Sequence, residues 1–138
     1  MDAFKLKIYA SDHPFFVGDC ESLVFPTADG LAGVQAHHRN MIVATVTGIL
    51  TFRTPDGQTH EASVSDGMMR VEDNEVLILV DSAERPDEID IARARRDADR
   101  AKEEMLQKKS MRDYLSAQAS MARALNRLRV SGRSGRVD

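Results

Sequence analysis

The amino-acid sequence predicts an all-β N-terminal domain followed by a C-terminal antiparallel α-helical hairpin. Up to Val80, short runs rich in Val, Ile, Leu, Phe and Thr recur about every ten residues, which is typical of a β-sandwich or barrel. Near Pro86 the apolar period changes from two residues to between three and four. The net charge also changes sign near this point. Residues 1–90 hold 6 basic and 16 acidic residues, whereas residues 91–138 hold 13 basic and 6 acidic residues.

Alternating apolar and polar residues predict the strands. Phe4, Leu6 and Ile8 alternate with polar neighbours, as expected when one face of an antiparallel sheet is buried. No helix of ten residues is indicated before residue 86. The predicted strands are residues 4–9, 15–17, 20–25, 31–35, 41–46, 48–53, 58–64, 67–71 and 75–80.

Two turns support this order of strands. The segment Pro55-Asp56-Gly57 predicts a tight hairpin, because Asp-Gly supplies the positive φ that such turns favour. Asp73-Asn74 plays a similar part between the last two predicted strands. Residues 1–85 are therefore predicted to form one small β-domain, which is long enough for a marginal core of its own.

A long helix is predicted from Pro86. Proline needs no intrahelical donor in a first turn, and the acids Asp87, Glu88 and Asp90 complement the helix dipole. The first apolar stripe consists largely of alanine, which permits close helix approach. Its members are Ile91, Ala94, Ala98, Ala101 and Met105.

A second helix follows a polar break at residues 107–110. Its predicted apolar stripe is Met111, Leu115, Ala119, Ala122 and Leu125. The two helices form a hairpin over residues 86–130, and its thin apolar seams predict that the hairpin can move. Residues 131–138, with Ser-Gly-Arg-Ser-Gly-Arg, are predicted to be a flexible basic tail.

Several function classes are disfavoured by the sequence. No apolar stretch approaches the ~18 residues of a spanning helix, and no secretory signal is present, so we expect a cytoplasmic chain. Cys20 is the single cysteine and is expected in the core. A metal site at His37 and His38 is disfavoured because adjacent strand residues point to opposite faces. No triad or phosphate-loop signature is found, so the chain is not expected to be an enzyme.

The order of several motifs resembles one known family. An acidic β-domain is followed by Ile-Asp-x-x-Arg-Ala at residues 89–94, and residues 26–34 with His38 are similar to the family's Asp-Gly, Gly-Ile and His loop. Gly48, Gly67 and Asn74 fall where the family has glycine and a turn asparagine. The chain resembles the epsilon subunit of bacterial F-type ATP synthases over almost its whole length. It departs from the family at Asn40-Met41, where Pro-Leu is common, and at Gln35.

The resemblance implies a place in the central stalk. It implies a sandwich of about ten strands that binds the gamma subunit and the ring of c subunits, with Asp29, Gly30, Gly33 and His38 as partner-binding residues. It further implies a hairpin that folds back or extends toward the alpha/beta catalytic head, where the extended form inhibits ATP hydrolysis. A proton- or sodium-translocating synthase would hold the chain peripherally, at the cytoplasmic face of the membrane.

The resemblance also implies a regulatory ATP site, although no cofactor is required. Some bacterial members bind ATP on the folded hairpin, and the matching residues here are Glu84, Asp90, Arg93, Arg100, Arg123 and Arg127. If the turn between the helices centres near residue 109, Arg93 lies level with residue 125, between Arg123 and Arg127. Guanidinium groups suit phosphate because they stay charged and present paired donors.

Other interpretations remain open from the sequence. The arginines can instead form a solvated face, because Asp97 lies four residues after Arg93 and three before Arg100, at spacings of ordinary surface pairs. The Arg-rich second helix and tail also suit a nucleic-acid-binding regulator, although the acidic body and few aromatics argue against it. A third possibility is a structural adaptor without any inhibitory role.

Overall fold

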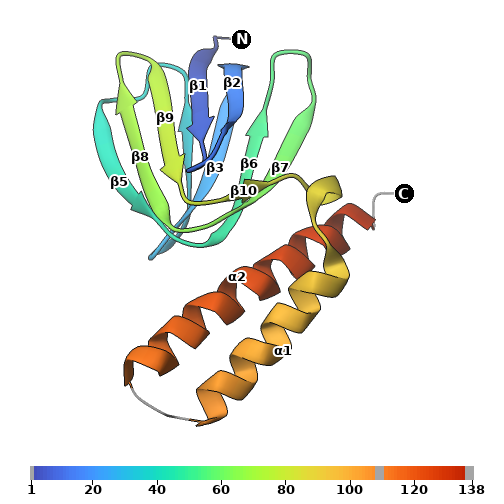
Figure 1. Cartoon of the computed structure of the whole chain (residues 1–138). Coiled ribbons are helices and arrows are strands. Elements are labelled where there is room, and N and C mark those ends of the chain that lie inside the picture. The colour runs from blue at the N-terminus through green and yellow to red at the C-terminus, as the bar shows by residue number, and fades with distance from the viewer. Residues whose placement is uncertain (1, 108–110, 136–138) are drawn as a thin grey trace. The chain divides into compact units, whose positions relative to one another are not determined.

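The chain folds into a β-sandwich followed by two helices, in a computed structural model that describes residues 2–107 and 111–135 (Figure 1). Contacts divide it into two compact units, Met1–Arg85 and Pro86–Asp138. The predicted fold class, a sandwich of about ten strands with a C-terminal helical hairpin, is confirmed. Each unit is described by itself below.

Ten strands in the described residues make two five-stranded sheets. The first sheet has the order β2-β1-β9-β8-β5, and the second has the order β10-β7-β6-β3-β4. Every predicted strand overlaps an observed strand, the predicted strand 20–25 corresponds mainly to β3, and β10 is added. The strands are β1 (Phe4–Tyr9), β2 (Pro14–Cys20), β3 (Ser22–Thr27), β4 (Gly30–Gln35), β5 (Met41–Thr45), β6 (Gly48–Arg53), β7 (Thr59–Val64), β8 (Gly67–Glu72), β9 (Glu75–Val80) and β10 (Ala83–Glu84).

The first strand shows how the apolar pattern builds the core. Phe4, Leu6 and Ile8 are buried, whereas the side chains between them face outward. Antiparallel pairing joins β1 to β2, and parallel pairing joins β1 to β9. The inner faces of the two sheets share one apolar cluster, whose largest side chains include Phe25, Phe52, Leu23 and Ile78. Burial of this apolar surface is the main stabilising term for the sandwich.

The hairpin predicted at residues 55–57 joins β6 to β7. Gly57 has a φ of +87°, which glycine adopts without steric cost. The Asp56 carboxylate accepts hydrogen bonds from the Thr54 hydroxyl and from the Gln58 amide, the latter at 3.2 Å. These bonds lower the pKa of Asp56, with the Thr54 hydroxyl as the larger cause. The turn therefore stabilises the ionised carboxylate and holds the two strands in register.

Cys20 lies in the sandwich core, as the sequence predicts. Its thiol donates to the carbonyl oxygens of Ser22 and Arg53 at 3.0 and 3.2 Å. Burial raises the pKa of Cys20, so the thiol stays protonated at neutral pH. A protonated buried thiol is a poor nucleophile and a poor metal ligand.

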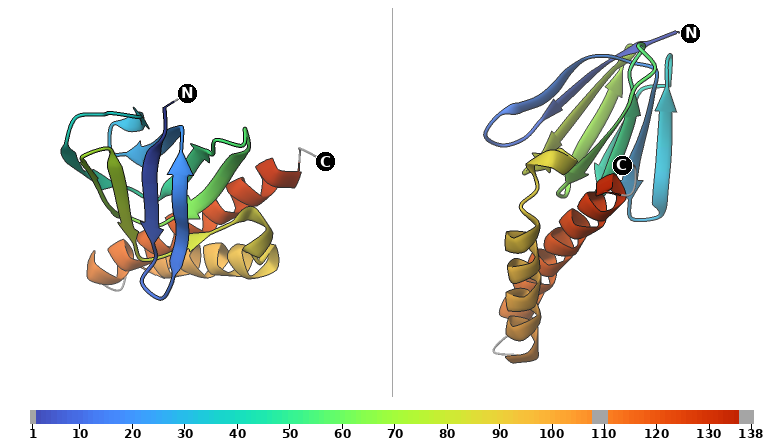
Figure 2. Two further views of the ribbon diagram at one scale, coloured as in Figure 1. Left: turned by 90° about the horizontal axis from the view of Figure 1, so that it is seen from above. Right: turned by 90° about the vertical axis from the view of Figure 1, so that its right-hand side faces the viewer.

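Among its described residues, the second unit contains one 3₁₀ turn and two antiparallel helices (Figure 2). Residues Pro86–Glu88 form η1, α1 spans Ile91–Gln107 and α2 spans Met111–Gly135. The predicted helix start at Pro86 is thus corrected, because the acidic first turn is 3₁₀ and the α-helix begins at Ile91. The tail expected from residue 131 is helical as far as Gly135, and residues 136–138 lie outside the described residues.

The apolar face of α2 differs from the predicted one. Leu115, Ala119, Ala122 and Leu125 are exposed, and the side chain of Met111 lies outside the described residues. Ala117 and Ala124 are buried instead. On α1 the predicted alanines Ala94, Ala98 and Ala101 are buried, and α1 packs against α2. Alanines on both helices permit close approach, and this favours them over the bulkier leucine stripe.

Candidate functional site

Asp90 caps the N-terminus of α1. Its carboxylate accepts a hydrogen bond from the Arg93 amide at 3.0 Å, and its carbonyl accepts the first intrahelical bond, from Ala94, at 2.9 Å. A carboxylate at this position satisfies a backbone donor and complements the positive helix end. Asp90 therefore has a structural role besides the ligand role that the resemblance implies.

We expect Asp90→Ala to destabilise the first turn of α1 by about 1 kcal/mol, because an amide donor loses its acceptor. Asp90→Ser should retain most of that stability, since serine also caps helices but lacks the charge. Amide hydrogen exchange at Ile91 to Ala94 checks both variants. Equal exchange in Asp90→Ala and the unchanged chain would show that the cap contributes nothing.

An ion-pair cluster joins the two helices at Asp97. Arg100 Nη2 donates to Asp97 Oδ1 at 2.8 Å, and Arg127 Nη1 lies 4.0 Å from Asp97 Oδ2. The sequence predicted Arg93 between the levels of Arg123 and Arg127, whereas the cluster places Arg127 beside Asp97, one turn beyond Arg93 on α1. The prediction assumed facing residues symmetric about residue 109, whereas the alanine contacts set a different register.

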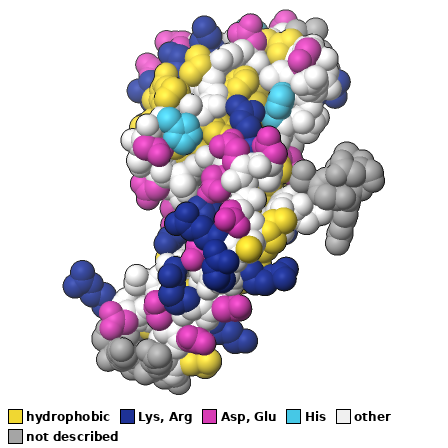
Figure 3. Space-filling view, turned by 45° about the vertical axis from the view of Figure 1, so that its right-hand side comes forward, with side chains coloured by type: hydrophobic (Ala, Val, Ile, Leu, Met, Phe, Trp, Pro, Cys, Tyr) yellow, Lys and Arg dark blue, Asp and Glu magenta, His cyan; other side chains and the backbone are white. Residues whose placement is uncertain are grey.

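The remaining arginines of the predicted site flank this cluster. Arg123 lies one turn before Arg127 on α2 and donates to Ser120 Oγ at 3.2 Å. Arg93 lies one turn before Asp97 on the same face of α1, and its side chain is exposed. Lys and Arg side chains gather over the helices on the face shown in Figure 3. The hairpin thus brings Arg100 and Arg127 together through one carboxylate.

Glu84 belongs to the sandwich unit. It lies in β10, where its backbone is paired with Ser63 of β7. The hairpin cluster described above is built from residues of α1 and α2 alone. The predicted role of Glu84 toward a ligand stays a prediction.

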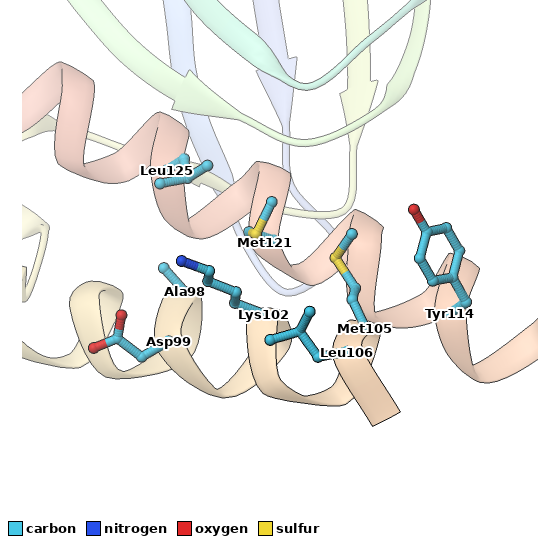
Figure 4. Close-up of a pocket in the computed structure, with 8 residues that line it drawn as sticks. All are labelled: Ala98, Asp99, Lys102, Met105, Leu106, Tyr114, Met121 and Leu125. Carbon is cyan, nitrogen blue, oxygen red and sulfur yellow. The ribbon is translucent and has the colours of Figure 1, made fainter. Parts of the chain in front are cut away.

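A second feature of the hairpin is an apolar groove between the helices (Figure 4). Its volume is about 630 Å³. Exposed Leu106 and Leu125 form part of its wall. The lining residues are Ala98, Asp99, Lys102, Met105 and Leu106 from α1 and Tyr114, Met121 and Leu125 from α2. The sequence prediction missed this groove because it placed Leu125 in the helix contact.

The predicted partner-binding residues lie along the edge strand β4 of the second sheet, with Asp29 and Gly30 at one end and His38 beyond the other. Asp29 and Gly30 form the turn between β3 and β4, where the Thr27 hydroxyl donates to the Gly30 carbonyl at 2.7 Å. Gly33 and His38 line a groove of about 490 Å³ beside β3 and β4. A Cβ atom added at Gly33 would lie 3.6 Å from the Leu23 carbonyl, an ordinary contact. The sandwich thus tolerates a side chain at Gly33, and glycine there leaves the groove open.

Two asparagines position the loop that carries His38. Asn74 accepts a hydrogen bond from the His37 amide at 2.7 Å and donates to the Ala3 carbonyl at 3.0 Å. Asn40 accepts from the Asp73 amide at 3.0 Å. These contacts join segments far apart in the chain, so period and composition gave no signal for them.

The outer face of the first sheet exposes apolar side chains. Val17, Ile42, Met68 and Leu79 all point to this face, opposite the buried side chains of β1. Ile42 is 70% exposed. Met68 and Leu79 are cross-strand partners on this face, whereas Lys7 and Arg70 lie in the row between Val17 and Ile42.

Two family models together match nearly the whole chain. The ATP synthase delta/epsilon chain beta-sandwich domain matches residues 3–86, and the ATP synthase delta/epsilon chain long alpha-helix domain matches residues 87–132. The chain belongs to the ATP synthase delta/epsilon chain family. The boundary between the two matches falls where the structure divides into its two units.

Curated relatives agree with this membership. An ATP synthase epsilon chain of Ruminiclostridium cellulolyticum is 36% identical over 133 residues, which cover 96% of this chain and 98% of the relative. One of Nitratidesulfovibrio vulgaris strain DP4 is 41% identical over 126 residues, which cover 91% and 89%. The family's epsilon chains are non-catalytic ATP synthase subunits, so the prediction that this chain is not an enzyme is confirmed.

Solved ATP synthases contain the same fold. A chain of the Euglena gracilis mitochondrial ATP synthase aligns with a TM-score of 0.76 at 20% identity, covering 87% of this chain and 76% of that one. A chain of the Tetrahymena thermophila mitochondrial ATP synthase central stalk and c ring aligns with a TM-score of 0.63 at 10% identity, covering 92% and 95%. At these identities the likeness concerns the fold.

Two exclusions apply to the described part of this epsilon-family chain. Within residues 2–107 and 111–135, no group of three or more His, Cys, Asp or Glu side chains could hold a metal ion. Among the described helices, none is long and apolar enough to cross a membrane. The His37 and His38 pair therefore joins no such group in these residues.

Proposed function

We propose that this chain is the rotor-stalk subunit that couples the catalytic head of an F-type ATP synthase to its c ring, and that its hairpin inhibits ATP hydrolysis. Family membership supports the assignment to the synthase. In this role the chain is peripheral, at the cytoplasmic face of a membrane whose synthase translocates protons or sodium ions. Its partners are the gamma subunit, the c ring and, when the hairpin extends, the alpha/beta head.

The sandwich supplies the contacts to the rotor in this proposal. The exposed apolar face of the first sheet and the open groove at Gly33 and His38 are two surfaces suited to protein partners. The Asp29-Gly30 turn belongs to the same sheet as this groove and lies at the opposite end of β4 from His38. We assign gamma and c-ring contacts to these surfaces on the strength of the family resemblance.

ATP acts as a regulatory ligand of the folded hairpin in this proposal. The observation that carries it is the contact of Arg100 from α1 and Arg127 from α2 with one carboxylate. A position that gathers cations from both helices exists only while the helices are packed together. A polyphosphate that binds there stabilises the folded hairpin by mass action and depletes the extended, inhibitory form.

Calorimetric titration of ATP into the full chain tests the ligand site. We expect saturable binding that Arg93→Ala and Arg127→Ala each weaken about tenfold, since charge-assisted hydrogen bonds to phosphate contribute about 1.5–3 kcal/mol. Arg112→Ala is the matched control, because this substitution removes the same charge at the far end of α2, about 22 Å from Arg127. Absence of binding at millimolar ATP, or equal weakening by Arg112→Ala, would contradict the site.

A further inference from the structure

Asp97 occupies the centre of the hairpin's arginine cluster. One carboxylate oxygen is 2.8 Å from Arg100 Nη2 on the same helix, and the other is 4.0 Å from Arg127 Nη1 on the neighbouring helix. The Asp97 side chain is only 23% exposed, and that of Arg127 is 29% exposed. The carboxylate therefore lies against both helices, unlike an acid directed into solvent.

Helix geometry places two further arginines around this carboxylate. Arg93 lies one turn before Asp97 on α1, and Arg123 lies one turn before Arg127 on α2. Because the helices are antiparallel, the turn that carries Arg123 is level with the turn that carries Arg100. Two of the four arginines, Arg100 and Arg127, thus lie at the Asp97 carboxylate, and the other two are one helical turn away.

We propose that Asp97 is an internal counter-anion that a polyphosphate must displace in order to bind the hairpin. The inference rests on the proposed ATP site and assigns the regulation of that site. In the ligand-free hairpin the carboxylate neutralises part of the arginine charge. In the bound hairpin, phosphate oxygens take its place at Arg100 and Arg127, and Asp97 then repels the bound anion.

Asp97 has two opposing effects on the affinity for ATP, and their relative sizes decide whether it raises or lowers that affinity. The carboxylate orients the arginines, which favours ligand binding, but an ion pair to Arg100, whose side chain is 69% exposed, is weak. The same carboxylate repels a triphosphate, which carries several negative charges and would lie within a few ångströms. Repulsion therefore outweighs orientation, and Asp97 lowers the affinity for ATP.

The variant Asp97→Asn tests this sign, because asparagine keeps the shape and removes the charge. We expect it to bind ATP about fivefold to tenfold more tightly than the unchanged chain, which corresponds to the loss of one close like charge near a surface. Asp99→Asn is the matched control. Asp99 is exposed, lies on the same helix and lines the apolar groove, so its removal reports only the change in net charge.

Calorimetric titrations of the full chain separate the outcomes. The counter-anion is supported if Asp97→Asn binds ATP more tightly than Asp99→Asn does. The gain in affinity must also be lost in the double variant Asp97→Asn with Arg127→Ala. Unchanged or weaker binding by Asp97→Asn, while Arg93→Ala still weakens binding, overturns the counter-anion and leaves the ATP site in place. Absence of saturable binding by every variant overturns both. Circular dichroism of each variant verifies that the helices remain folded.

Discussion

Gly67→Ala is expected to destabilise the sandwich by about 3 kcal/mol, because an added methyl group overlaps the backbone of the neighbouring strand. A Cβ atom at Gly67 would lie 2.1 Å from the Leu79 carbonyl oxygen and 2.7 Å from Val80 Cγ1. Gly67 pairs with Val80 in the antiparallel β8–β9 ladder, and β9 also pairs with β1. Relief of the overlap must therefore move the backbone at this end of the β8–β9 ladder.

Native-state hydrogen exchange of the β8 and β9 amides measures this loss, since protection of those amides reports the free energy of opening. Gly33→Ala is the control, because its Cβ atom meets only the Leu23 carbonyl, at 3.6 Å, and lies in the open groove. It should change the stability by less than about 1 kcal/mol. Equal effects of the two substitutions would show that the close approach at Gly67 relaxes without cost.

Phe52→Ala is expected to lower the free energy of unfolding by about 3–5 kcal/mol, because it leaves a cavity in the sandwich core. The Phe52 side chain is 1% exposed. Its ring centroid lies 4.7 Å from that of Phe16 and 5.0 Å from that of His60, with the His60 ring stacked on it. The substitution removes both ring contacts together with the buried apolar area.

Exchange of the β6 and β7 amides under denaturant measures the effect of Phe52→Ala. The matched control is Leu31→Ala, because Leu31 is a large apolar residue of the same sheet but is 72% exposed. It should shift stability by no more than about 0.5 kcal/mol. A loss below about 1 kcal/mol for Phe52→Ala would mean that the aromatic cluster collapses to fill the space.

Local patterns predicted the strands well. Alternation of apolar residues in β1 and the Asp56-Gly57 turn both concern neighbours in the chain, so a short stretch of sequence contains the whole signal. The pairing of β1 with β9 is different. It joins Leu6 to Val76 in a parallel ladder, and no local period indicates a partner at that separation.

The register of the two helices could not be predicted in the same way. The apolar period placed Leu115, and not Ala117, in the helix contact, but the packing depends on which side chains permit close approach. The structure buries Ala117 and leaves Leu115 exposed. The level of Arg127 shifts accordingly, from Arg93 toward Asp97.

The candidate site was predicted by residue type but not by arrangement. The resemblance indicated the arginines, and the sequence indicated that Asp97 is spaced for surface pairs with Arg93 and Arg100. Only the structure joins Asp97 to Arg127 across the helices. Likewise, Asn74 was predicted as a turn residue, whereas its contacts with Ala3 and His37 depend on the folded sandwich.

The inhibitory role is tested most directly by the rate of ATP hydrolysis of the assembled synthase. This rate is compared between a synthase that holds the full chain and one that holds a chain ending at Arg85. The proposal predicts that removal of residues 86–138 raises the rate about fivefold or more, the usual lower size of an allosteric coupling. Co-purification of the shortened chain with gamma verifies that the sandwich is still bound. An unchanged rate, with the shortened chain present, would contradict the inhibitory hairpin and make this subunit a structural adaptor.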